Sequence, residues 1–224
     1  MSELLFFKKG PAVIPATEKI TNFFGFKIKR GESYIIKEPK PERSFEIFVN
    51  VVKSICSECP QKGAFTCESI GCMECTFSCP CKSCKDTRAQ GICFTMDPPE
   101  SLRHRYLLQT TPIFWISKYG EGSINPANPG IIANMIHEFI RTSKNPVVLL
   151  EGIEFLCIMN GFIPVLKFLH DIRDRIILNN AILILPLNPA ALDKKELALI
   201  ERNMQSVEFS SKGFELYNIL RRDH

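Results

Sequence analysis

Eight cysteines crowd into one short segment of this chain and constrain its fold more than any other feature. The chain has 224 residues and ten cysteines, and only Cys93 and Cys157 lie outside the segment 56–84. Three pairs have the C-x2-C spacing that lets two thiolates hold one ion from a tight turn. The clustered cysteines are Cys56, Cys59, Cys67, Cys72, Cys75, Cys79, Cys81 and Cys84.

These thiolates predict metal binding rather than a disulfide framework. Disulfides usually stabilise small secreted chains with little core, whereas 45% of this chain is apolar. Eight cysteines fill two tetrahedral four-cysteine zinc sites without remainder. The segment has few apolar residues, so metal binding would have to supply its folding free energy, on the order of 10 kcal/mol per zinc ion. We interpret residues 56–90 as a metal-binding insertion.

The sequence leaves two identities open for the metal. Pure thiolate ligation suits two structural zinc ions, which we favour. An iron–sulfur cluster uses the same ligands, and Cys72-x2-Cys75-x3-Cys79-Pro80 resembles the end of a bacterial ferredoxin motif, although Cys67 is spaced x4 rather than x2. We interpret Cys93 and Cys157 as buried small apolar residues rather than ligands.

Short apolar strands alternate with amphipathic helices around the cysteine segment. The predicted strands are 33–37, 91–96, 112–117, 146–150, 181–185 and 207–209, and the predicted helices are 44–55, 98–107, one from 129, 161–178, 193–203 and 214–222. This alternation predicts an α/β fold, a three-layer arrangement with a mostly parallel sheet covered on both faces. The expected parts are an N-terminal extension (1–30), an α/β core (31–55 and 91–211), the insertion 56–90 and a C-terminal helix (212–224).

The strand 33–37, the turn after it and the helix from Ser44 resemble the first strand, phosphate loop and first helix of RecA/KaiC-like ATPases. The strand 147–150 with Glu151 resembles their second nucleotide motif, a hydrophobic strand that ends in a carboxylate. A phosphate loop needs glycines so that backbone N–H groups can converge on the phosphates. Here the connection is Glu38-Pro39-Lys40-Pro41-Glu42-Arg43-Ser44, with two prolines, two glutamates and no glycine. We therefore expect a degenerate core that neither binds nucleotide nor hydrolyses ATP.

No other catalytic signature is present in the sequence. The motifs G-x-S-x-G, H-E-x-x-H and G-x-G-x-x-G are all absent, so we expect a protein that is not an enzyme and has no catalytic residues. Glu151 and Glu154 lie near the end of a predicted strand, where α/β folds place active sites. We favour simpler roles for them, at a polar strand end and a helix cap.

Further motifs are spread between Gly31 and about Arg202. They include Gly31-x-x-Tyr34-Ile35-Ile36, Pro99-x-x-Leu102-Arg103, Pro112-Ile113-Phe114-Trp115-Ile116-Ser117, Val148-Leu149-Leu150-Glu151-Gly152-Ile153-Glu154, Asn160-Gly161-Phe162 and Leu185-Pro186-Leu187-Asn188-Pro189. As a set they resemble the archaeal domain of unknown function 835. The resemblance implies a degenerate RecA/KaiC-like core with a regulatory role. The cysteine insertion departs from the family's usual pattern.

The net charge and the apolar runs limit the partners. A net charge of +4 from scattered basic residues is weak evidence for nucleic-acid binding. No apolar run reaches the roughly 18 residues of a membrane span, and the N-terminus does not resemble a signal peptide. We therefore expect a cytoplasmic protein without a membrane partner.

Three functions are compatible with these features. The leading one is a non-catalytic regulatory or assembly protein that binds a protein or ribonucleoprotein partner through the metal-stabilised insertion, with a homodimer also allowed. The first alternative is an iron–sulfur redox or electron-transfer protein. The second is a nucleic-acid or ribosome-associated factor that uses Lys82, Lys85, Arg88, Arg103 and Arg105.

Overall fold

A computed structural model describes residues 28–53, 89–108 and 110–209 of the chain. The eight clustered cysteines lie outside the described residues, as do almost all of the predicted N-terminal extension 1–30 and the predicted C-terminal helix 212–224. The described residues therefore represent the predicted α/β core.

Six parallel strands form one sheet in the described part of the chain. They are β1 (Glu32–Lys37), β2 (Gln90–Thr95), β3 (Ile113–Trp115), β4 (Pro146–Leu150), β5 (Ile182–Leu187) and β6 (Gln205–Glu208). Their order across the sheet is β3-β2-β4-β5-β1-β6, and each neighbouring pair is parallel. All carboxyl ends therefore meet at one edge of the sheet, where α/β proteins place their ligands.

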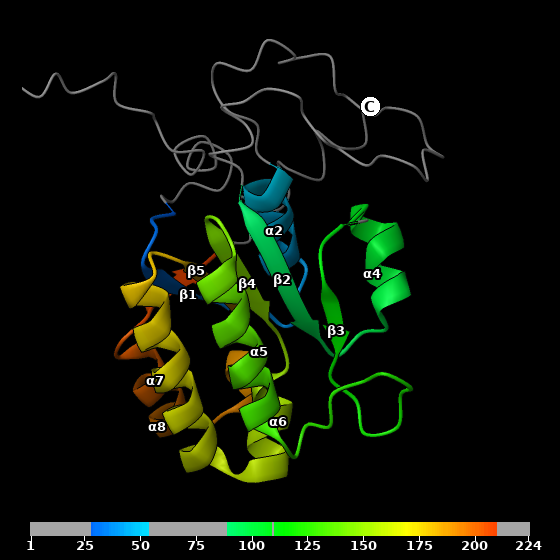
Figure 1. The fold of residues 1–224 in the computed structure, drawn as a ribbon. Coiled ribbons are helices and arrows are strands. Elements are labelled where there is room, and N and C mark those ends of the chain that lie inside the picture. Colours follow the sequence, from blue (N-terminus) through cyan, green and yellow to red (C-terminus); the bar gives the residue numbers. More distant parts are fainter. Residues whose placement is uncertain (1–27, 54–88, 109, 210–224) are drawn as a thin grey trace, which may run out of the picture.

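Helices cover both faces of this sheet. One face carries α2 (Arg43–Lys53) and α4 (Pro99–Tyr106). The other face carries α5 (Pro129–Thr142), α6 (Ile153–Asn160), α7 (Phe162–Leu178) and α8 (Lys194–Glu201). A short 3₁₀ turn, η1 (Pro189–Ala191), precedes α8. Figure 1 shows α5 and α7 in front of the strands. The predicted class, a three-layer α/β fold with a parallel sheet covered on both faces, is confirmed. No helix in the described ranges is long and apolar enough to cross a membrane.

The alternation of side chains along the strands divides the core into two apolar layers. On β4, Val148 and Leu150 pack on the α5–α7 side, whereas Val147 and Leu149 pack on the α2 side. All four are completely buried, as expected for a central strand of a parallel sheet. On the α2 side the packing is tight at Gly91 of β2, where an added Cβ would lie 2.6 Å from the Val52 side chain.

A proline lies inside β5 without breaking the sheet. The carbonyls of Ala181 and Leu187 accept hydrogen bonds from Gly31 and Glu38, so the odd-numbered residues of β5 bond to the β1 side. Pro186 therefore has its missing N–H on the β4 side. There the pairing with β4 ends at Ile184, so the proline removes no bond from the sheet.

The predicted elements of the core are present with small shifts at their ends, but one helix was not predicted. The sequence indicates no helix between Leu150 and Gly161, whereas Ile153–Asn160 form α6. This helix begins after Gly152 and ends at Gly161, which have φ angles of +85° and +83°. Apolar residues occupy almost all of its positions, so it lacks the 3.6-residue pattern that identifies a surface helix.

Candidate functional site

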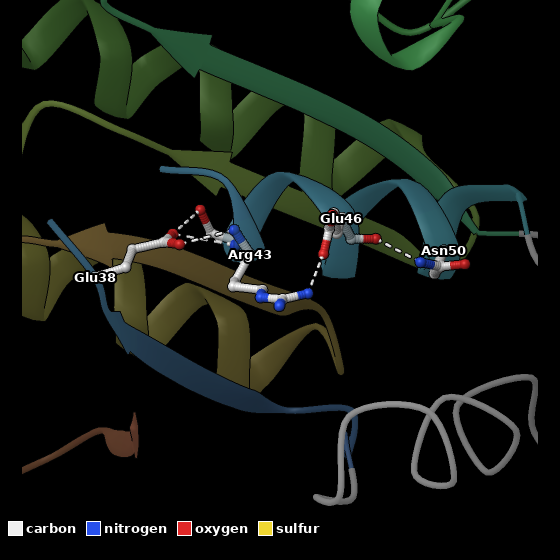
Figure 2. Close-up of polar contacts among 5 residues, drawn as sticks. Glu38, Arg43, Glu46 and Asn50 are labelled. Carbon is white, nitrogen blue, oxygen red and sulfur yellow. Dashed lines mark hydrogen bonds and ion pairs between the residues drawn. The ribbon is translucent and has the colours of Figure 1, made fainter. Parts of the chain in front are cut away.

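The chain between β1 and α2 folds around the side chain of Glu38. The N–H of Glu38 extends the sheet by donating to the carbonyl of Leu187 at 3.0 Å. Pro39 and Pro41 then restrict the backbone of the connection, and α2 begins at Arg43. The chain reverses here, so the Glu38 carboxylate reaches the first turn of α2 (Figure 2).

The Glu38 carboxylate accepts three hydrogen bonds from the start of α2. The N–H of Arg43 donates to Oε2 at 2.7 Å, and the N–H and hydroxyl of Ser44 donate to Oε1 at 3.1 and 2.5 Å. Glu38 is only 7% exposed and Ser44 is completely buried. The first N–H groups of a helix have no partner within the helix, and they attract anions. In this chain, Glu38 itself supplies the anion.

Burial and hydrogen bonding act on the pKa of Glu38 in opposite directions. Burial raises the pKa above its ordinary value, whereas hydrogen bonds from Ser44, Arg43 and Glu42 lower it, and the net shift is upward. The neighbouring guanidinium of Arg43 forms an ion pair with Glu46 at 2.8 Å (Figure 2). The charge of Arg43 is therefore directed along α2.

The two glutamates of the connection between β1 and α2, Glu38 and Glu42, have different environments. Both lie in the connection that the sequence analysis compared with a phosphate loop. Glu42 is exposed, whereas Glu38 is buried and bonded to the N–H groups of Arg43 and Ser44. A nucleotide phosphate at this helix terminus would need the same N–H groups.

Glu151 connects β4 to the end of β2. Its N–H donates to Phe94 at 3.0 Å. Its carboxylate Oε2 accepts from the Thr95 hydroxyl at 2.6 Å and from the Met96 N–H at 3.1 Å. Burial raises the pKa of Glu151, the negative charges of Asp97 and Glu154 raise it further, and the two hydrogen bonds oppose this rise. Glu151 is thus a polar strand end, as the sequence suggested.

Glu154 has a similar role one turn further along the chain. Its Oε1 accepts a hydrogen bond from the N–H of Asn188 at 2.6 Å. This bond joins the first turn of α6 to the residues that follow β5. The carboxylates of Glu38, Glu151 and Glu154 therefore each bind backbone N–H groups of a neighbouring segment at the carboxyl-terminal edge of the sheet.

The described residues contain no group of three or more His, Cys, Asp or Glu side chains that could hold a metal ion. The predicted ligands lie outside these residues, so the metal site stays a prediction. The two remaining cysteines are free thiols. Cys93 is completely buried, and Cys157 is half-buried, with burial raising its pKa to about 11. Cys93 matches its interpretation as a buried residue, whereas Cys157 is only partly buried and packs against the core.

The structure weakens one part of the nucleic-acid alternative. The guanidinium of Arg103 donates to the carbonyls of Leu108 at 2.7 Å and Thr111 at 3.2 Å. It therefore stabilises the connection between α4 and β3. An arginine engaged by backbone carbonyls has fewer donors left for a phosphate group.

Comparison with known proteins identifies a family and a shared fold. The family described as "Protein of unknown function (DUF835)" matches residues 81–204, and no curated protein matches the chain. The structure of PH0250 from Pyrococcus horikoshii OT3 is similar, with a TM-score of 0.50, 10% identity and 89% of each chain covered. The flagellar accessory protein FlaH from Methanocaldococcus jannaschii has a TM-score of 0.46 and 13% identity, covering 90% of this chain and 82% of FlaH.

The family match differs in extent from the resemblance found in the sequence. That resemblance was placed from Gly31 onward, whereas the match begins at residue 81. It leaves out β1 and α2, and it takes in the last residues of the predicted insertion. It covers more than half of the chain, from before β2 to the end of α8. The chain therefore belongs to the DUF835 family of proteins of unknown function.

Proposed function

We propose that this protein is a non-catalytic regulatory or assembly factor. Its α/β core acts as a scaffold, and its cysteine-rich segment 56–90, folded around two zinc ions, binds a protein or ribonucleoprotein partner. The observation that supports a non-catalytic core is the position of the Glu38 carboxylate on the N–H groups of Arg43 and Ser44. We further propose a cytoplasmic location, because reducing compartments keep thiolates available for metal.

Competition at the start of α2 is the physical basis of the proposal. A bound phosphate would have to displace Glu38 from three hydrogen bonds. The displaced carboxylate would be a buried charge without a partner, which costs several kcal/mol. The connection offers no compensation, because Pro39 and Pro41 have no N–H to donate.

Phosphate release from ATP tests the non-catalytic part. The full chain, purified with its metal, is incubated with magnesium and ATP beside the Arg43→Ala variant. Both are expected to release phosphate at the uncatalysed rate. Release by the wild-type protein that disappears in the variant would overturn the proposal, because Arg43 would then serve as a phosphate-binding residue.

Metal analysis tests the role of the cysteine-rich segment. Protein purified without oxygen is expected to be colourless and to contain two zinc ions per chain. Cys75→Ser removes a predicted ligand and should lower the zinc content, whereas Cys157→Ser should leave it unchanged. Iron and sulfide with visible absorption would instead support the redox alternative, and protein without metal would exclude both.

A further inference from the structure

The helix α7 exposes one continuous stripe of side chains. Its opposite face is buried in the core through Val165, Phe168, Leu169, Ile172 and Ile176. The exposed residues are Ile163, Pro164, Lys167, His170, Asp171, Asp174, Ile177 and Leu178. With 3.6 residues per turn, they fall within an arc of about 140° around the helix. Positions 163, 167, 170, 174 and 177 have the alternating spacing of four and three residues that is typical of a coiled-coil contact.

The stripe is apolar at both ends and charged in the middle. Ile163 is 56% exposed at one end, and Ile177 and Leu178 are 47% and 83% exposed at the other. Single exposed apolar residues are ordinary on protein surfaces. Two apolar groups at opposite ends of one helix face, with charges between them, are instead the pattern of a contact surface.

The exposed stripes of two copies match in charge and apolar character when the two helices run antiparallel. A two-fold axis passing between residues 170 and 171 pairs each exposed position with another position of the stripe. The resulting pairs are Ile163–Leu178, Pro164–Ile177, Lys167–Asp174 and His170–Asp171. Apolar residues therefore meet apolar residues, and the lysine and the histidine each meet an aspartate. Each pair occurs twice, as in an isologous dimer.

We propose that α7 forms a homodimer interface in which the stripes of two copies pack antiparallel. The charge pattern selects a second copy as the partner, because each lysine finds its opposite charge on the same stripe. It also selects the antiparallel orientation. In a parallel pair, Lys167 would face Lys167 and Asp171 would face Asp171, and like charges in contact are unfavourable.

Contacts within one chain leave the aspartates available for this interface. Asp171 pairs with Arg175 at 3.1 Å and Asp174 pairs with Arg173 at 3.2 Å. The two aspartate side chains are still 53% and 67% exposed. Surface pairs of this kind contribute less than about 1 kcal/mol, so each carboxylate can accept a second partner.

Exposed apolar residues also occur close to α7 in the chain. The helix has 17 residues and is about 25 Å long, whereas a standard interface buries about 800 Å² on each partner. Ile158 and Met159 at the end of α6 are 79% and 37% exposed and lie just before Ile163 in the chain.

Sedimentation equilibrium of the full chain with a charge exchange tests the interface. The wild-type protein is expected to dimerise. Lys167→Asp and Asp174→Lys should each raise the dimer dissociation constant roughly tenfold or more, because like charges then face each other at two places. The double variant should return close to the wild-type constant. Lys118→Asp, the same charge reversal at an exposed position outside α7, should leave the constant unchanged.

Three results would overturn the proposal. One is a wild-type protein that stays monomeric over the whole concentration range. Another is a dimer that Lys167→Asp does not weaken, which would place the contact elsewhere. The third is a double variant that dimerises no better than the single ones. Circular dichroism and thermal unfolding of each variant verify that the exposed substitutions leave the fold intact.

Discussion

At the scale of single residues, two glutamates at the carboxyl-terminal edge of the sheet use their carboxylates differently. Glu38 accepts hydrogen bonds at both oxygens, from Arg43 at Oε2 and from Ser44 at Oε1. Glu151 receives the bonds from Thr95 and Met96 at Oε2. A side-chain amide has one oxygen that accepts hydrogen bonds and one NH₂ group that donates them. It can therefore replace a carboxylate that accepts at only one oxygen. Where both oxygens accept, its NH₂ group would face another donor. The same substitution should therefore have different effects at the two positions.

Glu38→Gln is expected to destabilise the protein by about 1–3 kcal/mol, because the amide NH₂ would face a backbone N–H and leave a buried donor unpaired. Urea unfolding at neutral pH measures the change. Glu100→Gln, in the exposed first turn of α4, is the matched control and should change stability by less than about 0.5 kcal/mol. Equal stability of the two variants would show that the bonds of Glu38 contribute nothing to the fold.

Glu151→Gln is expected to have an effect that depends on pH. The pKa of Glu151 is raised in the folded state, so its contribution to stability is complete below the ordinary value of 4.5 and is lost as the pH rises through the raised pKa. Glutamine does not titrate and keeps an oxygen for Thr95 and Met96. The stability of the variant relative to wild type should therefore increase between about pH 4 and pH 7. A relative stability that is constant over this range would contradict the raised pKa.

The role of Glu38 could be predicted only in part from the sequence. The absence of glycine and the presence of two prolines predict that the connection after β1 does not form a phosphate loop. The role of Glu38 could have been found from the period of two along β1, since Tyr34 and Ile36 pack on the α2 side and residue 38 continues that series. The sequence could not predict that the turn returns Arg43 and Ser44 to within hydrogen-bonding distance.

At the scale of elements, helix starts were easier to predict than a short helix that is apolar on nearly all sides. The helices predicted from 129 and from 193 start where predicted: Asn128 precedes α5, and Asp193 precedes α8 and forms a capping box with Glu196. The helix α6 was missed because it is apolar on nearly all sides and gives no periodic signal. The strand β5 was predicted to end at Leu185, but it continues to Leu187. Proline is ordinarily excluded from a central strand, and Pro186 is tolerated because the pairing with β4 ends at Ile184.

The N-cap residues of α5 and α8, Asn128 and Asp193, should differ in their contribution to stability. Asp193 accepts from the N–H of Glu196 at 2.7 Å, whereas the side chain of Asn128 makes no capping hydrogen bond. Asp193→Ala should therefore cost about 1 kcal/mol, and Asn128→Ala should cost less than about 0.5 kcal/mol. Thermal unfolding of the two variants measures the difference, and a larger loss for Asn128→Ala would contradict the assignment of the caps.

At the scale of the whole molecule, the start of α2 lies at the carboxyl-terminal edge of a parallel sheet, and the buried carboxylate of Glu38 accepts its first N–H groups. The strand order that places β1 between β5 and β6 brings Glu38 to the edge where ligands of α/β proteins bind. The sequence predicts the fold class, because alternation of strands and helices implies parallel layers. It does not predict the strand order, which depends on contacts between segments far apart in the chain.

The most direct test of the central claim is calorimetric titration of the full chain with magnesium and ATP. The account predicts no saturable binding at millimolar nucleotide, because Glu38 already occupies the N–H groups of Arg43 and Ser44. Saturable binding that is weakened by Arg43→Ala would contradict it.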